Sequence, residues 1–563
     1  MKAVAVSLAF ALVTAAWTQS KQESISSAPK RLSPTEQLWC PVLNSALSGA
    51  SAAEPPMRSY LLDALAGGLS KCAPRKVRKV LIDSFTATLS IPESQEEISQ
   101  KTRRVASEGE RPDQATMESI FNLETKRRLQ ESALTHLLTV DEATVESLLP
   151  RAEPDVRATL LSWMISRATS AKKLDRALEL LNRAKENFPY GEATQLMLAL
   201  PAKRDTDKQE IFRVAMAADR NQHSLVIGGD DFASMIVRFW QHLPPALVLD
   251  AIHQVLDAAH SGEGSGVTLS ATSGIVGFTR ERDYRVFELL PILRQLDDDE
   301  AENLLKDSQE AQLQLKQFPN GIQSIEPTIG DTPTKEGERQ GIGGSSGPPN
   351  EADQIFQATK AQVEEIVRTA EANPRQAIAA AATLPESVGP AWRLEFPRGQ
   401  AYLGTARTLI KTNHSAARDA LEKMAESLKH APHPYHTMDK WVDGIEIARE
   451  MDEVDLALKL FRSGMEQADR LRSEDADPDD PNIALKAWWP SVSAYWRLVL
   501  ASSQFSPQTA LEQVAEIKDP EILLLLEVRL ASKSVGAHAD RSLTMVHKKS
   551  SHQSWAEFRS LER

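Results

Sequence analysis

A recurring helical phrase is the feature that most constrains the fold of this chain. It reads LDRALELLNRA from Leu174, RDALEKMAESL from Arg418, VDLALKLFRSG from Val454 and PQTALEQVAEI from Pro507. Each copy places an alanine and then a large apolar residue on one helical stripe, and each is flanked by another helical stretch. This pattern predicts an all-α fold of stacked antiparallel helical hairpins, an α-solenoid-like architecture, rather than one closed core.

Prolines mark the expected beginnings of several of these helices. A proline in the first turn costs no hydrogen bond, because the N–H that it lacks has no partner inside the helix. The prolines that we expect at helix starts are Pro154, Pro245, Pro374, Pro507 and Pro520.

The chain is also too long for a single compact core, because 563 residues exceed the usual size of one domain. Residues 319–350 are rich in Gly, Pro, Ser and Thr and contain few large apolar side chains, which is typical of a flexible linker. We therefore expect an N-terminal helical repeat block at residues 34–318 and a C-terminal one at residues 351–533. Residues 534–563 are expected to form a polar tail.

The N-terminus resembles a secretory signal peptide. Lys2 supplies a positive charge, and the run from Ala3 to Ala16 is apolar or small but too short to span a bilayer. The alternative is a buried first helix, which would normally carry a polar face. We expect a signal peptide at residues 1–20, a polar and disordered leader at 21–33, and a secreted or periplasmic protein with no transmembrane anchor after signal removal.

The chain contains two cysteines, Cys40 and Cys72. In an oxidising compartment such a pair can form a disulfide, which would stabilise the N-terminal region by roughly 3–4 kcal/mol. The alternative is two buried thiols. Spacing alone does not decide between them, because a disulfide requires the two side chains to meet in space.

One segment departs from the helical pattern and predicts a small β-hairpin insertion. Val267, Leu269 and Ile275 lie in strand-compatible runs on either side of a Thr-Ser-Gly turn. The alternative is a long irregular loop. Because ordered loops on helical scaffolds often carry recognition, these three residues are candidates for a binding surface.

The densest aromatic cluster is the second candidate surface, and it contains Trp488, Trp489 and Trp496. An exposed cluster could anchor a peptide or stack on a sugar. The alternative is a helix core, because aromatic residues seven and eight positions apart lie on one helical face.

Charge and motifs argue against several functional classes. With 65 basic and 78 acidic residues the net charge is −13, which repels a phosphate backbone, so nucleic-acid binding is not expected. Prolines interrupt the histidine segment KHAPHPYHTMD, and the acidic segment SEDADPDDPN lacks the glycine and glutamate of a calcium loop. No metal, cofactor or catalytic residue is predicted.

In its repeats the chain resembles the tetratricopeptide family. The residues that match positions of that motif are Ala177, Leu181, Ala184 and Pro189 in one copy, and Trp441, Ala457 and Phe461 in another. The positions that depart from it are Ile165, Ala168, Gly464 and Asp469. The resemblance implies a right-handed helical stack that binds peptides or protein surfaces in a concave groove, and it implies no reaction.

The spacing of the repeats looks irregular in the sequence. The alanines Ala377, Ala420, Ala457 and Ala510 are 43, 37 and 53 residues apart. We therefore expect degenerate repeats with insertions between them.

Together these observations predict an exported helical-repeat scaffold or protein-binding module with a protein or peptide partner. The alternative is an envelope enzyme that acts on a glycan or peptide from an all-α scaffold. That enzyme would need paired acidic residues on facing helices, which a single sequence does not reveal.

Overall fold

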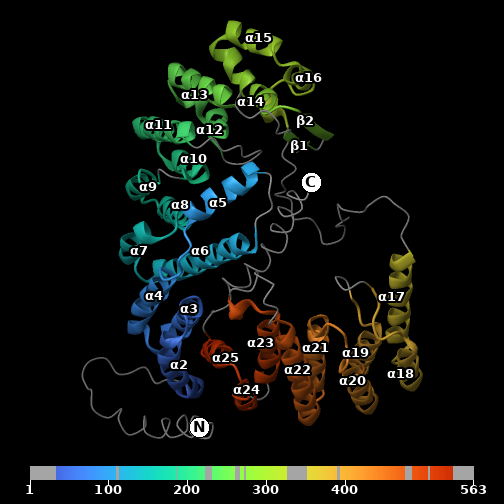
Figure 1. The fold of residues 1–563 in the computed structure, drawn as a ribbon. Helices are drawn as coiled ribbons and strands as arrows, with labels where there is room; N and C mark the ends of the chain where they lie inside the picture. The colour runs from blue at the N-terminus through green and yellow to red at the C-terminus, as the bar shows by residue number, and fades with distance from the viewer. Residues whose placement is uncertain are drawn as a thin grey trace, which may run out of the picture. The chain divides into compact units, whose positions relative to one another are not determined.

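The computed structural model describes residues 33–108, 113–184, 187–221, 231–259, 267–271, 274–325, 351–389, 394–475, 485–504 and 507–536. Throughout these residues the fold is all-α apart from one two-stranded hairpin (Figure 1). The signal peptide predicted at residues 1–20, nearly all of the leader, residues 326–350 of the linker and residues 537–563 of the tail lie outside the described residues.

The chain forms two compact units. Unit 1 comprises Met1–Leu148 together with Ser345–Arg563, and unit 2 comprises Leu149–Gly344. This division cuts the expected N-terminal block, residues 34–318, and joins its first part to the C-terminal block, residues 351–533. Unit 2 is thus inserted into the sequence of unit 1.

Unit 1 is built from helices of both chain ends. Its first elements are α2 (Pro34–Ala52), α3 (Pro55–Cys72), α4 (Pro74–Thr88), α5 (Gln95–Glu108), α6 (Gln114–Val140) and α7 (Glu142–Leu148). Its later elements are α17 (Glu351–Thr369), α18 (Pro374–Thr383), α19 (Pro397–Leu409), α20 (His414–Leu428), η7 (Pro434–Thr437), α21 (Met438–Glu450), α22 (Val454–Asp475), η9 (Lys486–Trp488), α23 (Pro490–Ser503), α24 (Pro507–Val514) and α25 (Pro520–Ser534).

The later helices of unit 1 stack in two rows. The first helices of successive hairpins contact one another, α17 with α19, α19 with α21 and α21 with α23. The second helices do the same, α18 with α20 and α20 with α22. This is the arrangement of a helical solenoid, in which each hairpin buries its apolar stripe only against its neighbours.

These hairpins repeat every 40 residues, because α18, α20 and α22 begin at Pro374, His414 and Val454. The residue before each helix accepts a hydrogen bond through its carbonyl from a buried alanine N–H, always at 3.0 Å. The three pairs are Asn373 with Ala377, Asn413 with Ala417, and Glu453 with Ala457.

The prediction of irregular spacing is therefore wrong for the repeats that contain the first three alanines. Ala417, and not Ala420, is equivalent to Ala377 and Ala457. Ala417 and Ala420 are both fully buried, since positions three apart share one helical face, and the sequence pattern alone gave no reason to prefer the earlier one. The longer step to α24 remains, because α22 has 22 residues whereas α20 has 15.

The N-terminal and C-terminal helices of unit 1 meet at α25. This helix contacts α2 and α3 as well as α23 and α24, so that the N-terminal hairpins continue the packing of the C-terminal ones. Ile522, Leu525 and Leu526 of α25 are fully buried. Unit 1 therefore requires both chain ends for its core.

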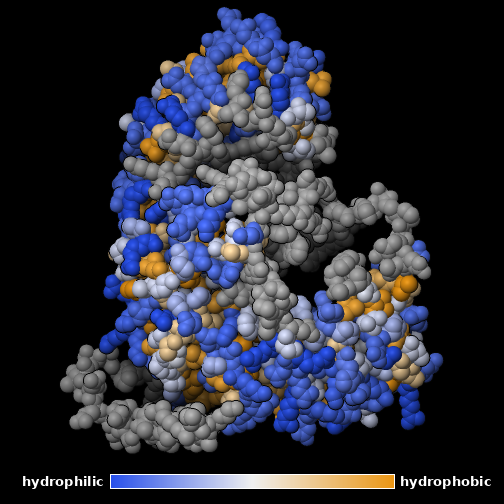
Figure 2. Space-filling view, viewed as in Figure 1, coloured by the Kyte–Doolittle hydropathy of each residue, from blue (hydrophilic) through white to orange (hydrophobic). Residues whose placement is uncertain are grey.

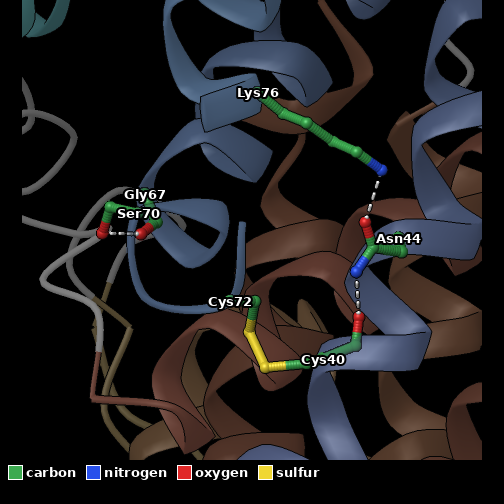
Figure 3. The surroundings of a disulfide bond; sticks show 6 residues. All are labelled: Cys40, Asn44, Gly67, Ser70, Cys72 and Lys76. Atoms are coloured by element: carbon green, nitrogen blue, oxygen red, sulfur yellow. Dashed lines mark hydrogen bonds between the residues drawn. A yellow bond between two sulfur atoms is a disulfide. The ribbon is translucent and has the colours of Figure 1, made fainter. Parts of the chain in front are cut away.

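A disulfide lies beside this junction. It joins Cys40 of α2 to Cys72, the last residue of α3, with the two Cα atoms 5.4 Å apart (Figure 3). The side chain of Asn44 donates to the carbonyl oxygen of Cys40 and accepts from Lys76 of α4, each at 2.9 Å. Covalent and polar contacts thus hold the first three helices together.

Unit 2 repeats the two-row arrangement. Its helices are η1 (Leu149–Arg151), α8 (Pro154–Ser170), α9 (Leu174–Leu181), α10 (Tyr190–Ala199), η2 (Ala202–Arg204), α11 (Asp205–Asn221), α12 (Phe232–Phe239), η3 (Trp240–His242), α13 (Pro245–Ala258), α14 (Glu281–Leu296), α15 (Asp298–Lys306), α16 (Gln309–Gln317) and η5 (Gly321–Ser324). The helices α8, α10, α12, α14 and α16 contact one another in that order, and α11 contacts α13.

The predicted hairpin and helix starts are confirmed. Strands β1 (Val267–Ala271) and β2 (Gly274–Phe278) pair antiparallel, with Val267 opposite Phe278. All five prolines expected at helix starts are first residues of helices, in α8, α13, α18, α24 and α25.

Candidate functional site

The predicted tryptophan cluster lies where η9 meets α23 in unit 1. Trp488 ends η9, Trp489 precedes α23, and Trp496 lies in the middle of α23. All three side chains are half-buried, whereas the neighbouring Tyr495 is fully buried. The cluster is thus neither a closed core nor a freely exposed patch.

Arginines from other helices stack on two of these rings. The guanidinium carbon of Arg529 in α25 lies 5.8 Å from the ring centre of Trp496 and 5.6 Å from that of Tyr60 in α3. The guanidinium carbon of Arg128 in α6 lies 5.5 Å from the ring centre of Trp488. Attraction between a cation and a ring face holds such pairs in a fixed geometry.

We call Tyr60, Arg128, Trp488, Trp496 and Arg529 the cation–aromatic cluster. Its residues come from α3, α6, η9, α23 and α25, and η9 contacts α3, α23 and α25. The cluster therefore exists only because the two ends of the chain fold together. Sequence reasoning found its tryptophans but not its arginines or Tyr60, because no local pattern shows which distant side chains meet them.

A further pair of the same kind joins Lys440 of α21 to Phe396, the residue before α19. The ammonium nitrogen of Lys440 lies 5.8 Å from the ring centre of Phe396, and burial lowers the pKa of Lys440. Four of the five cation–π pairs among the described residues thus belong to unit 1. A half-buried lysine costs desolvation energy, which the ring face partly offsets.

The two arginines of the cluster differ in their partners. Nε of Arg128 donates to Oε1 of Glu124 at 2.8 Å. Arg529 donates from Nη2 to the Tyr60 hydroxyl at 2.5 Å, and its Nε is buried without an acceptor. Within the described part of the chain no carboxylate pairs with Arg529, so its charge is balanced by ring faces and one hydroxyl alone.

Glu527, also on α25, is a carboxyl group with a perturbed pKa. Burial raises the pKa of Glu527 to about 7, and no neighbouring charge contributes to that shift. It lies two residues before Arg529, which places the two side chains on different sides of the helix. A carboxyl group that titrates near neutrality is one mark of a functional site.

Unit 2 contains a different kind of charged cluster, buried around α14. Arg285 donates from Nη2 to Asp231 and from Nη1 to Glu288, both at 2.7 Å, and all three residues are at most 5% exposed. Burial raises the pKa of Glu288 to about 7, although Arg285 acts to lower it. Sequence reasoning missed this cluster, because charged residues inside a helix normally indicate a solvated face.

The hairpin does not present the surface that its sequence suggested. Val267 is fully buried, so the expectation that it contributes to a binding surface is wrong. Its partner Phe278 is also buried, with its ring centre 5.8 Å from that of Tyr284 and 5.3 Å from that of Phe287 in α14. Leu269 is half-buried, and the side chain of Ile275 lies outside the described residues.

The surface drawn in Figure 2 is largely hydrophilic in that view, interrupted by separate apolar patches, one of them near α17 and α19. Ile355 of α17 is among the large apolar side chains exposed to solvent.

Within the described residues no group of three or more His, Cys, Asp or Glu side chains is arranged to hold a metal ion. No helix in that part of the chain combines the length and apolar character that a membrane span requires.

Comparisons with known proteins add little to this picture. No protein-family model matches the chain, and no curated protein matches it. One similar solved structure is described as a circular tandem repeat protein with novel repeat topology and enhanced subunit contact surfaces. It aligns over 92% of this chain and 99% of its own length, at 13% identity and a TM-score of 0.13. A score this low does not establish a common arrangement, so the helices and contacts described above carry the conclusion that this chain is an all-α protein of stacked helical hairpins.

Proposed function

We propose that this protein is an exported helical-repeat scaffold that binds a protein or peptide partner at the cation–aromatic cluster. The observation that carries the proposal is the stacking of Arg128 and Arg529 on half-buried tryptophan rings contributed by other helices. Aromatic residues and arginine are the types that dominate binding energy at protein interfaces. Their rigid placement lowers the entropy that binding would otherwise cost.

The charge of the cluster suggests the chemistry of the partner. Trp488 and Trp496 supply half-buried ring faces, and Arg128 and Arg529 supply guanidinium groups that suit carboxylates. The chain as a whole is acidic, with a net charge of −13. An acidic peptide segment that also carries an apolar side chain would complement this cluster and would be repelled elsewhere.

The proposed export rests on the N-terminal sequence and is supported by the disulfide between Cys40 and Cys72, since disulfides persist mainly in oxidising compartments. Cell fractionation followed by N-terminal sequencing tests it. We expect the protein outside the cytoplasm and beginning near residue 21. Recovery of a chain that still begins at Met1 in the cytoplasm would contradict export.

The proposed relationship to tetratricopeptide repeats is one of general architecture. The three regular hairpins repeat every 40 residues, whereas that family repeats every 34 or so. A period of about 40 residues is also found among other helical-hairpin repeats. We infer a degenerate α-solenoid of this broader kind.

Binding to an array of acidic, aromatic-containing peptides tests the proposed function directly. The probe is the chain without residues 1–20, compared with Trp496→Ala and with the control Trp163→Ala. Trp163 in α8 of unit 2 is a suitable control because its side chain is 44% exposed and lies outside the cluster. We expect Trp496→Ala to weaken binding about 30-fold, as is typical of a central aromatic residue, and Trp163→Ala to leave it unchanged. Equal binding by all three proteins would overturn the proposal.

A further inference from the structure

We propose that Arg529 is the anchor for a carboxylate group of the bound partner. The inference rests on the proposed binding function, and it assigns a ligand chemistry to one residue of that site. It starts from the unbalanced charge of this side chain.

Arg285 and Arg529, both members of cation–π pairs, differ in whether a carboxylate balances their charge. Arg285 in unit 2 has carboxylate oxygens of Asp231 and Glu288 at 2.7 Å, so its charge is neutralised inside the protein. Arg529 has no such partner among the described residues, although its Nε is buried. A cation removed from water without a counter-charge is costly, which points to an anion supplied from outside.

The contacts of Arg529 leave one side of its guanidinium without a hydrogen-bond partner among the described residues. The rings of Tyr60 and Trp496 lie at similar distances from the guanidinium carbon, 5.6 and 5.8 Å. The Tyr60 hydroxyl takes the Nη2 donor at 2.5 Å. A ligand oxygen can therefore approach along the edge of the guanidinium that Tyr60 does not occupy, which is where carboxylates bind arginine.

Tyr60 then acts as a positioning residue. Its ring and hydroxyl fix the rotation of the guanidinium, so that less entropy is lost when the carboxylate binds. Arg529 lies on α25 and Tyr60 on α3, and these helices contact each other. The anchor is thus held by the packing between the two chain ends.

Calorimetric titration of the chain lacking residues 1–20 with hexaglutamate tests the inference, and hexaglutamine of equal length is the uncharged reference. We expect hexaglutamate to bind and Arg529→Met to weaken it at least about tenfold, because a charge-assisted contact is lost. Arg529→Lys should recover part of the affinity. The control is Arg418→Met on α20, where the arginine already pairs with Glu453 at 2.7 Å, and it should bind normally.

Further arms of the titration separate the possible results. Inorganic phosphate in place of hexaglutamate shows whether any anion suffices, and displacement of hexaglutamate by millimolar phosphate would overturn carboxylate selectivity. Thermal unfolding of each variant shows whether a lost affinity reflects lost folding. If Arg529→Met unfolds, Arg529→Lys, which keeps the charge, decides the case.

If Arg529→Met still binds hexaglutamate and the array peptides, the anchor is refuted while the proposed function stands. If the wild-type protein binds none of the array peptides, the proposed function itself fails.

Discussion

Gly68 of α3 lies so close to Ser532 of α25 that a β-carbon on the glycine would come within 2.6 Å of the serine hydroxyl oxygen. The same β-carbon would lie 2.8 Å from a methyl carbon of Leu43 in α2. Helices α2 and α3 from the N-terminal part of the sequence and α25 from the C-terminal part therefore pack closely at Gly68, which has no side chain. This contact joins the N-terminal hairpins to the C-terminal ones.

The first prediction concerns this contact. Gly68→Ala should destabilise unit 1 by about 1–3 kcal/mol, because Leu43 and Ser532 are fully buried and cannot easily move aside. Denaturant unfolding measures the change. The control is Gly277→Ala, since a β-carbon at Gly277 would meet nothing within 4 Å. A variant at Gly68 as stable as the wild type would refute the close packing of α3 on α25.

Removal of the disulfide is the second prediction. Replacing Cys40 and Cys72 by serine should lower the free energy of unfolding by about 3–4 kcal/mol, because the bond closes a loop between residues 32 positions apart. A reducing agent should destabilise the wild type similarly and leave the double variant unchanged. If the reducing agent has no effect on the wild type, the bond does not contribute to stability.

The third prediction compares the equivalent turns that precede α18 and α20, whose starts lie one repeat apart. The Asn413 side chain accepts a hydrogen bond from the Ala416 N–H at 3.1 Å, whereas the Asn373 side chain makes no such bond at the start of α18. Asn413→Ala should cost about 1 kcal/mol and Asn373→Ala clearly less. Thermal unfolding of the two variants checks the difference, and equal losses would argue against a role for the cap.

Local patterns made much of the fold predictable, and contacts between distant segments account for the rest. The helix starts at proline and the strands around Gly274 depend on nearby residues, and the sequence located them. The equivalence of Ala417 with Ala377 depends on a turn whose hydrogen bonds the sequence does not display. Trp496 could be selected as a candidate, but its stacking on Arg529 depends on packing between the chain ends.

The fourth prediction concerns His136 of α6. Its Nδ1 lies 2.7 Å from Oδ1 of Asp63 in α3, and the charge of that carboxylate raises the pKa of His136. The pair should therefore stabilise unit 1 fully below pH 6.5, and this contribution should disappear as the pH rises through the folded-state pKa. Asp63→Asn should remove the part of the pH dependence that comes from this pair, measured as a smaller difference in stability between pH 5.5 and 8.5 than in the wild type. The same pH dependence in both proteins would exclude the pair as its source.

The fifth prediction concerns Glu288 in the buried cluster of unit 2. Its pKa is raised from 4.5 to about 7, so the folded protein holds a proton that the unfolded chain releases. Stability should therefore be highest below pH 4.5, fall as the pH rises towards 7 and level off above it, by a total on the order of 3 kcal/mol. Denaturant unfolding between pH 4.5 and 8 measures this fall.

Glu288→Gln separates this effect from that of Glu527, whose pKa is also raised to about 7. The glutamine cannot ionise, so the fall in stability attributable to unit 2 should disappear, while Arg285 keeps its contact with Asp231 at 2.7 Å. Glu527→Gln should leave that fall in place, because Glu527 belongs to unit 1. If Glu288→Gln shows the same pH dependence as the wild type, the glutamate is already ionised throughout this range, and Arg285 outweighs the effect of burial.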